Sequence, residues 1–208
     1  MATEIKVKSK HRKLKGVWVA KLVTDTIDSL TYETEVRKIM GASEMSNDQK
    51  TSTEITNYDD EPAVIIENED SPTVKFSGSA LSEEDRAFIN GQDYDAENGC
   101  VSEVLDAEKP YLAVGYMYEN TDGTKVMCWF LKGKVTSTPE SHKTKNGTDS
   151  NGDEFEYTPI STIHKFADTG KNAYRFKVSQ NGNEKITMDE FFSKVYEVDS
   201  YKDFLKKN

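Results

Sequence analysis

Apolar and polar residues alternate along most of the chain, and this alternation is the pattern of half-buried β-strands. Residues 16–23, GVWVAKLV, show it first, and the run then turns polar at Thr24 and Asp25. Each such run is rich in β-branched and aromatic residues and is bounded by Gly, Pro, Asn or Asp, as strands usually are. The predicted strands are residues 16–23, 63–68, 73–80, 111–120, 125–135, 154–166 and 173–180.

The strongest local signal lies between residues 111–120 and 125–135. Asp122-Gly123 separates these two runs, and this dipeptide favours the positive φ angles that a two-residue hairpin turn requires. We therefore predict that the two strands form a β-hairpin.

Two segments carry helix signals. In residues 81–91, Ser82 can act as the N-cap, and Gly91 suits the position after the last turn. In residues 187–198, Thr187 and Glu190 have the spacing of a capping box. The residues that follow predict a short closing helix ending in lysines, so residues 187–208 form a C-terminal helical segment.

Many strands and few helices predict a mainly β chain, with a β-sandwich or barrel-like sheet pair, one or two packed α-helices and long loops. The length of 208 residues favours one domain, which we place at residues 16–208. Two segments lack periodicity: residues 41–62 are predicted to form a long polar loop, and residues 136–153 a second one.

Composition makes the chain polar and acidic. Hydrophobic residues make up 35%, the mean hydropathy is −0.74 and the net charge is −10. Residues 1–15 hold six basic residues and one acidic residue, and we interpret them as a solvated basic N-terminal arm. Residues 44–108 hold eighteen acidic and three basic residues. A surface this acidic repels phosphates, so sequence-specific or tight nucleic-acid binding is not expected.

Cysteine usage and apolar runs bear on the compartment. Cys100 and Cys128 lack the spacing of a metal or redox motif, and two thiols suggest a reducing compartment without a disulfide framework. No secretory signal or transmembrane run is evident, so no membrane association is expected.

An enzyme would need a constellation of catalytic residues, and the sequence does not provide one. His11, His142 and His164 lack partners at metal-ligand spacing, and nucleotide-binding and nucleophile motifs are missing. Paired carboxylates are too abundant here to single out a glycosidase pair. Residues 93–99 resemble a calcium loop but fail at its sixth and twelfth positions. We therefore expect no enzyme and no cofactor.

Aromatic residues of the predicted hairpin admit two interpretations. Tyr116, Tyr118, Trp129 and Phe130 can fill a core, as such residues in paired strands usually do. They can also form an exposed platform. The second interpretation gives an alternative function, a monomeric β-sandwich binding module, for example for carbohydrate.

Several motifs follow one another in an order that resembles a known family. GVWVAKLV is followed by Gly41-Ala42, which opens the long polar loop, and YDDEPAVIIE closes that loop. SALSEEDRAFINGQDYDAENGCV then contains the short helix and a turn, and PYLAVGYMYENTDGTKVMCWFLKGKV contains the hairpin. In this order, over residues 16–180, the chain resembles the major tail proteins, or tail tube proteins, of bacteriophages with long non-contractile tails.

The resemblance implies a structural virion protein with a tail-tube fold. Such proteins form hexameric rings in which a sheet from each subunit joins its neighbours, and the rings stack into a tube through loops and terminal arms. The implied partners are other copies of the chain and the tape-measure and tail-end proteins. DNA passes through the lumen during ejection without specific binding. The implied location is the phage tail, after synthesis in the cytoplasm of the host bacterium.

The long polar segments and the basic arm are then candidates for contacts between subunits or rings. The arm can meet the acidic region 44–108 of another subunit and fix the register by charge. The residues predicted to make such contacts are Lys6, Lys8, Lys10, Arg12, Lys13, Tyr58, Asp59, Asp60, His142, Lys143 and Lys145.

Overall fold

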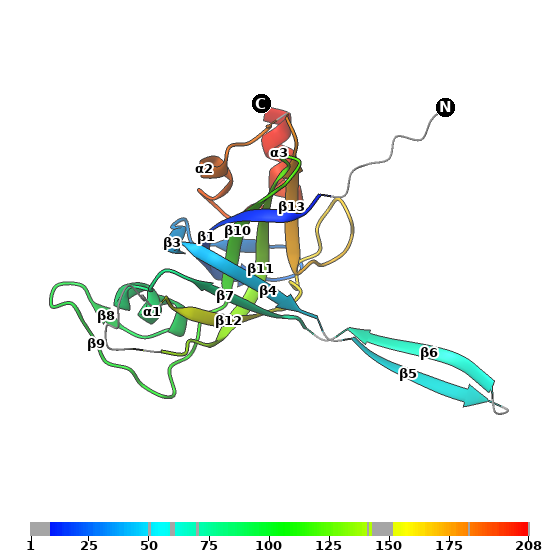
Figure 1. Cartoon of the computed structure of the whole chain (residues 1–208), viewed down its shortest axis with the longest axis horizontal. Coiled ribbons are helices and arrows are strands. Elements are labelled where there is room, and N and C mark those ends of the chain that lie inside the picture. Colours follow the sequence, from blue (N-terminus) through cyan, green and yellow to red (C-terminus); the bar gives the residue numbers. More distant parts are fainter. Residues whose placement is uncertain are drawn as a thin grey trace.

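The computed structural model describes residues 9–49, 51–58, 61–69, 71–140, 142, 152–182 and 184–207. Within them the chain forms antiparallel strands and a few helices (Figure 1). The strands are β1 (His11–Asp25), β2 (Leu30–Tyr32), β3 (Arg37–Met40), β4 (Ala42–Asp48), β5 (Thr51–Tyr58), β6 (Glu61–Glu69), β7 (Thr73–Gly78), β8 (Tyr94–Asp95), β9 (Cys100–Val101), β10 (Leu112–Asn120), β11 (Lys125–Ser137), β12 (Glu154–Pro159) and β13 (Arg175–Gln180). The helices are α1 (Glu83–Asn90), α2 (Met188–Phe191) and α3 (Val198–Lys207).

The main sheet closes on itself. Its strands pair in the order β2–β1–β10–β11–β12–β7–β4, and β3 also pairs with β1. Only Gly41 separates β3 from β4, so these two strands form one continuous stretch of chain. This stretch pairs with β1 through β3 and with β7 through β4, and it thereby joins the two ends of the strand order. The sheet is therefore barrel-like, and the prediction of a mainly β fold is confirmed.

A close backbone contact holds this crossover together. The N–H of Ser79 donates to the carbonyl of Gly41 at 2.9 Å, and the N–H of Gly41 donates to Ser79 Oγ at 3.0 Å. At Gly78, a Cβ atom would overlap the carbonyl oxygen of Gly41 and the side chain of Met40. The missing side chain of Gly78 thus lets β7 approach the bend between β3 and β4.

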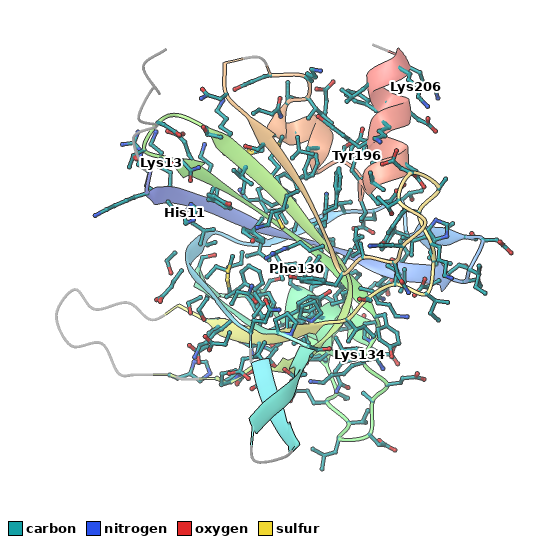
Figure 2. The ribbon with its side chains drawn as sticks, turned by 90° about the vertical axis from the view of Figure 1, so that its right-hand side faces the viewer. His11, Lys13, Phe130, Lys134, Tyr196 and Lys206 are labelled. Atoms are coloured by element: carbon teal, nitrogen blue, oxygen red, sulfur yellow. The ribbon has the colours of Figure 1, made fainter. Side chains whose placement is uncertain are left out.

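Side chains of the central strands form two apolar clusters, one on each face of the sheet. In β1, Val17 and Val19 enter the inner cluster, whereas Trp18 and Ala20 enter the outer cluster. Because both faces are covered, β10 and β11 are nearly continuous apolar runs instead of alternating ones. Phe130 belongs to the inner cluster and lies at the centre of the molecule (Figure 2).

The C-terminal segment covers the outer cluster. Trp18 stacks on Phe192 with ring centroids 3.9 Å apart, and Trp129 Nε1 donates to the carbonyl of Phe191 at 3.3 Å. Tyr196 packs edge-on against Phe204 of α3, with centroids 5.8 Å apart. The final two helices thereby take the place of a second sheet on this face.

The predicted helix signals are largely confirmed. Ser82 caps α1 through the N–H of Asp85, and Gly91 follows with a φ of 71°. The capping box before α2 also forms, but the single helix predicted over residues 187–198 is wrong in length. The carboxylate of Glu197 accepts two N–H groups of the next turn, and this second cap starts α3 as a separate helix.

Two segments predicted to be irregular contain strands, which corrects the sequence analysis. Residues 11–15 of the predicted arm 1–15 belong to β1, where His11 pairs with Asn120. Residues 41–62, predicted as a polar loop, contain β4, β5 and the start of β6. Backbone groups make the ladder, so a polar sequence without periodicity still forms a strand beside a suitable partner.

The hairpin of β10 and β11 is confirmed, although its connection is longer than two residues. Gly123 has a φ of 84°, and its N–H donates to the carbonyl of Asn120 at 3.0 Å. The strand predicted over residues 154–166 is wrong beyond Pro159, where β12 ends.

A carboxylate of β1 holds the chain that follows β12. Asp25 accepts the N–H groups of Ile163 and His164, each at 2.9 Å, and pairs with Lys132 Nζ at 2.6 Å. The Asp25 side chain is only 4% exposed. Burial would raise the pKa of Asp25, but the hydrogen bonds from Lys132, Ile163 and His164 outweigh it and lower the pKa below its usual value.

Replacing Gly78 by alanine should destabilise the crossover, because the new Cβ meets a backbone carbonyl that cannot move aside. We expect Gly78→Ala to lower the free energy of unfolding by about 1–3 kcal/mol. Gly41→Ala is the matched control, since a Cβ there lies 3.7 Å from its nearest neighbour, Ser79 Oγ. Urea denaturation measures both, and equal losses would contradict this account.

Asp25→Asn should lower the free energy of unfolding by about 3–5 kcal/mol at neutral pH, because Lys132 loses its buried partner. The pKa of Asp25 is lower in the folded state, so its contribution exists above the unfolded pKa of about 4. That contribution is lost as the pH falls through the folded pKa. Urea melts of both proteins at several pH values should therefore converge in acid, and the exposed Asp28→Asn variant should match the wild type throughout.

Candidate functional site

Strand β13 leaves one sheet edge without a partner strand. Among the described strands, β13 pairs with β11 alone, whereas the other strand outside the closed ring of the main sheet, β2, is only three residues long. Leu131 donates its N–H to the carbonyl of Tyr174 at 2.9 Å, which sets the alternation of the ladder. The backbone groups of Arg175, Lys177 and Ser179 consequently point away from β11.

A groove runs beside this edge on the outer face. It lies between β13 and α3 and has a volume of about 510 Å³. Phe176 and Val178 line it from the strand, and Tyr201 and Leu205 line it from the helix. Lys177, Lys185 and Lys202 also line the groove, so it offers the side chains of an added strand a surface that is partly apolar and partly basic.

A second cavity lies on the inner side of β13, between the start of β1 and β4. Its volume is about 450 Å³, and we call it the basic pocket. Glu44 is the single acidic residue in its lining. The pocket is lined by His11, Arg12, Lys13, Leu14, Ser43, Glu44, Met45, Asn47, Tyr116, Tyr118, Arg175 and Lys177.

Tyr116 of the pocket lining and its cross-strand neighbour Cys128 carry no charge near neutral pH. Burial raises the pKa of Cys128 to about 11, so this thiol, opposite Tyr116 on the neighbouring strand, stays protonated near neutral pH. Burial also raises the pKa of Tyr116. The Arg175 guanidinium lies over the ring of Tyr174 at 5.2 Å and over that of Phe130 at 5.7 Å.

The hairpin of β5 and β6 projects from the barrel (Figure 1). In the described residues these two strands form a sheet of their own, with Ile55 opposite Ile65. The sequence from residue 51 to 69 contains six acidic residues and no lysine or arginine. A strongly acidic element thus extends away from the body of the subunit.

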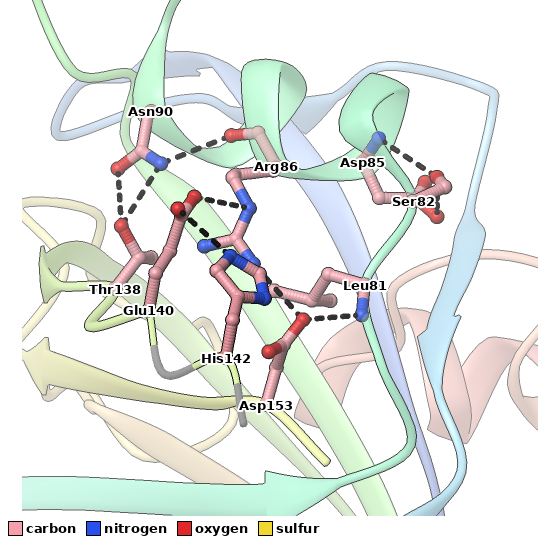
Figure 3. Close-up of polar contacts among 9 residues, drawn as sticks. All are labelled: Leu81, Ser82, Asp85, Arg86, Asn90, Thr138, Glu140, His142 and Asp153. Atoms are coloured by element: carbon pink, nitrogen blue, oxygen red, sulfur yellow. Dashed lines mark hydrogen bonds and ion pairs between the residues drawn. The ribbon is translucent and has the colours of Figure 1, made fainter. Parts of the chain in front are cut away.

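Both ends of the segment 136–153 make polar contacts with α1 and the residue before its cap (Figure 3). Arg86, 4% exposed, donates from Nη2 to Asp153 Oδ2 at 2.9 Å, and the same carboxylate oxygen accepts the N–H of Leu81 at 2.8 Å. At the N-terminal end of the segment, Glu140 Oε1 lies 3.2 Å from Arg86 Nε, but without hydrogen-bond geometry. Asn90 also donates to Thr138 Oγ1 at 3.1 Å. A buried arginine therefore fixes where this polar segment leaves and rejoins the barrel.

The predicted contact residues of the basic arm lie partly in β1. Lys10 pairs through its backbone with Thr121, and Arg12 and Lys13 lie 3.4 and 2.7 Å from Glu119 of the same chain. Figure 2 places Lys13 at the outer end of β1. Both Arg12 and Lys13 are half-exposed and share one carboxylate, so positive charge remains at this end of β1.

The other predicted contact residues are scattered. Tyr58 ends β5 opposite Glu61. His142 is exposed and lies 3.6 Å from Glu140. Their role in contacts stays a prediction. The predicted residues outside the described part of the chain are Lys6, Lys8, Asp59, Asp60, Lys143 and Lys145.

Sequence reasoning missed Arg175 and Lys177. A signal for them existed, because alternation in a strand places residues two apart on the same face. The run Arg175-Phe176-Lys177-Val178 therefore has one basic and one apolar face. Arg175 lines the basic pocket alone and Phe176 and Val178 line the groove alone, whereas Lys177 borders both.

The candidate catalytic groups are not brought together. His11 lies beside Asn120, His142 beside Glu140, and His164 beside the carbonyl of Ile27. In the described ranges, no group of three or more His, Cys, Asp or Glu residues could hold a metal ion. The two tryptophans, Trp18 and Trp129, are both buried.

No protein-family model matches the chain, and a search of curated proteins found no significant match. Over the part of the chain that the structure describes, no helix is long and apolar enough to span a bilayer.

Arg86→Met should remove the contacts of Arg86 with both ends of segment 136–153 and leave the carboxylate of Asp153 without its cation. We expect a loss of about 2–3 kcal/mol in the free energy of unfolding. Glu140→Gln, at a half-exposed partner, should cost under about 1 kcal/mol. Chemical denaturation compares the two, and an Arg86→Met protein as stable as the wild type would contradict the assigned role.

Proposed function

We propose that this chain is a self-assembling structural subunit whose copies form hexameric rings that stack into a bacteriophage tail tube. The observation that supports it most is the free edge of β13, which among the described strands pairs with β11 alone. An exposed six-residue edge is a template for another strand. A strand from a second copy satisfies these backbone groups.

Exposed apolar side chains also support assembly. Val104 and Leu105, on the connection between β9 and β10, are 53% and 109% exposed. Ile27 and Ile163 form a second exposed pair near Asp25, on the far end of β1 from the basic pocket. Neighbouring subunits can cover such groups, since a lone subunit leaves them in water.

The charge of the chain suits a tube that conducts DNA. A net charge of −10 makes the wall of a lumen repel phosphates, so DNA can pass without binding to it. In this proposal the tape-measure and tail-end proteins are the partners, the location is the phage tail, and the subunit performs no catalytic step.

The alternative, a monomeric carbohydrate-binding module, needs an exposed aromatic platform. Of the four aromatic residues that suggested such a platform, Tyr116, Trp129 and Phe130 are buried in the two apolar clusters and Tyr118 alone is partly exposed, so these four do not form a platform. The self-assembling subunit is therefore the better supported of the two.

Electron microscopy of the purified protein over a range of concentrations, together with sedimentation velocity, tests the proposal. Rings or hollow tubes are expected at high concentration. A protein that stays monomeric up to its solubility limit, and that also binds an oligosaccharide in a glycan screen, would overturn the proposal in favour of the binding module.

Ser179→Pro should block assembly without unfolding the subunit. The Ser179 N–H points away from β11, so proline leaves the internal ladder intact and removes a donor from the free edge. Ser179→Ala keeps that N–H and should assemble like the wild type. Sedimentation gives the oligomeric state and circular dichroism confirms folding; rings formed by a folded Ser179→Pro protein would rule out pairing at this edge.

A further inference from the structure

The basic pocket contains two cations that the subunit leaves unneutralised. Arg175 and Lys177 point into it from the same face of β13, and within the described residues neither forms an ion pair with a carboxylate. The pKa of Lys177 is lowered, first by burial and then by repulsion from Arg175. The subunit alone therefore bears an electrostatic cost that a bound anion removes.

The rest of the pocket reinforces this charge. Arg12 and Lys13 share Glu119, so the two cations have a single carboxylate between them, and Glu44 is the one acid in the lining. Asn47, also in the lining, has a buried Oδ1 without a hydrogen-bond partner in the described structure. A positive, incompletely paired cavity is thus present on a protein of net charge −10.

We propose that the acidic hairpin of β5 and β6 from a second copy docks in the basic pocket, beside the free edge of β13. The two strands of the hairpin contain four acidic residues and no basic residue, so their charge complements Arg175 and Lys177. This inference rests on the proposed self-assembly and names the segment and the pocket that meet in it.

The hairpin of the same chain is not placed to fill this pocket. It continues from β4, forms its own two-stranded sheet, and points away from β13 in Figure 1. A hairpin from a neighbouring copy has no such constraint. Its approach lets carboxylates face Arg175 and Lys177, whose backbone groups line the same edge, and opposite charges on paired strands stabilise the pairing.

Charge reversal of the pocket is the first test. The double variant Arg175→Glu/Lys177→Glu should raise the concentration needed for assembly on the order of tenfold at low salt. The control Lys171→Glu/Lys207→Glu makes the same change in net charge at exposed lysines outside the pocket and the groove and should assemble normally. Circular dichroism verifies that both variants are folded. Wild-type assembly by the folded pocket variant would overturn the inference while leaving the proposed function intact.

Complementary reversal of the hairpin then identifies the partner segment. Lysine substitutions in the hairpin alone should weaken assembly, and combining them with the reversed pocket should restore it, because the attraction is re-formed with opposite signs. Loss that is merely additive in the combined protein would refute pairing between these segments. The hairpin substitutions are Glu54→Lys, Glu61→Lys, Glu67→Lys and Glu69→Lys.

A binding measurement decides the matter if the wild type does not assemble. A synthetic peptide of residues 51–69 is titrated into the full chain while the amide resonances of β13 are followed by NMR. Shifts at Arg175 and Lys177 that disappear at high salt support the pocket even if tubes do not form. Absence of shifts with the peptide, or shifts produced equally by inorganic phosphate, would reject the hairpin as the ligand.

Discussion

Backbone pairing is the constraint on which the rest of this structure depends, because each buried N–H and C=O group needs a partner. The main sheet meets it by closing, and the closure rests on the contact between Gly41 and Gly78, where one stretch of chain changes from β1 to β7 as its partner. Closure gives the sheet an inner face that fills with side chains and an outer face that the C-terminal helices cover. The edge of β13 that faces away from β11 has no partner among the described strands.

Some charged side chains have an ion-pair partner within the same subunit, and others do not. Asp25 with Lys132, and Arg86 with Asp153, are nearly buried pairs that join segments far apart in sequence, so they stabilise the single subunit. Arg175 and Lys177 have no such partner in the described part of the chain, and they lie next to the open edge. The unpaired cations and the unpaired backbone groups of β13 thus lie side by side, and a strand with carboxylates from a second copy can pair with both.

Local signals gave correct predictions wherever neighbouring residues decide the conformation. The caps of α1 and α2 and the hairpin at Gly123 depend on a few adjacent residues, and the structure contains them. Predictions failed where a distant strand decides. Residues 11–15 and 41–62 form strands because β10, β7 and β6 pair with them, and β12 stops at Pro159 because Asp25 holds the chain that follows.

The sequence by itself determined the mainly β character, the positions of most strands, the helix caps and the uneven charge, since these follow from side-chain type and spacing. Only the tertiary structure decided which strands close the barrel, that Glu119 neutralises part of the basic arm, and that Arg175 and Lys177 remain open beside an unpaired edge. The reason is physical. Register and ion pairing depend on which segments meet in space, and a backbone ladder carries almost no signature in the residues that form it.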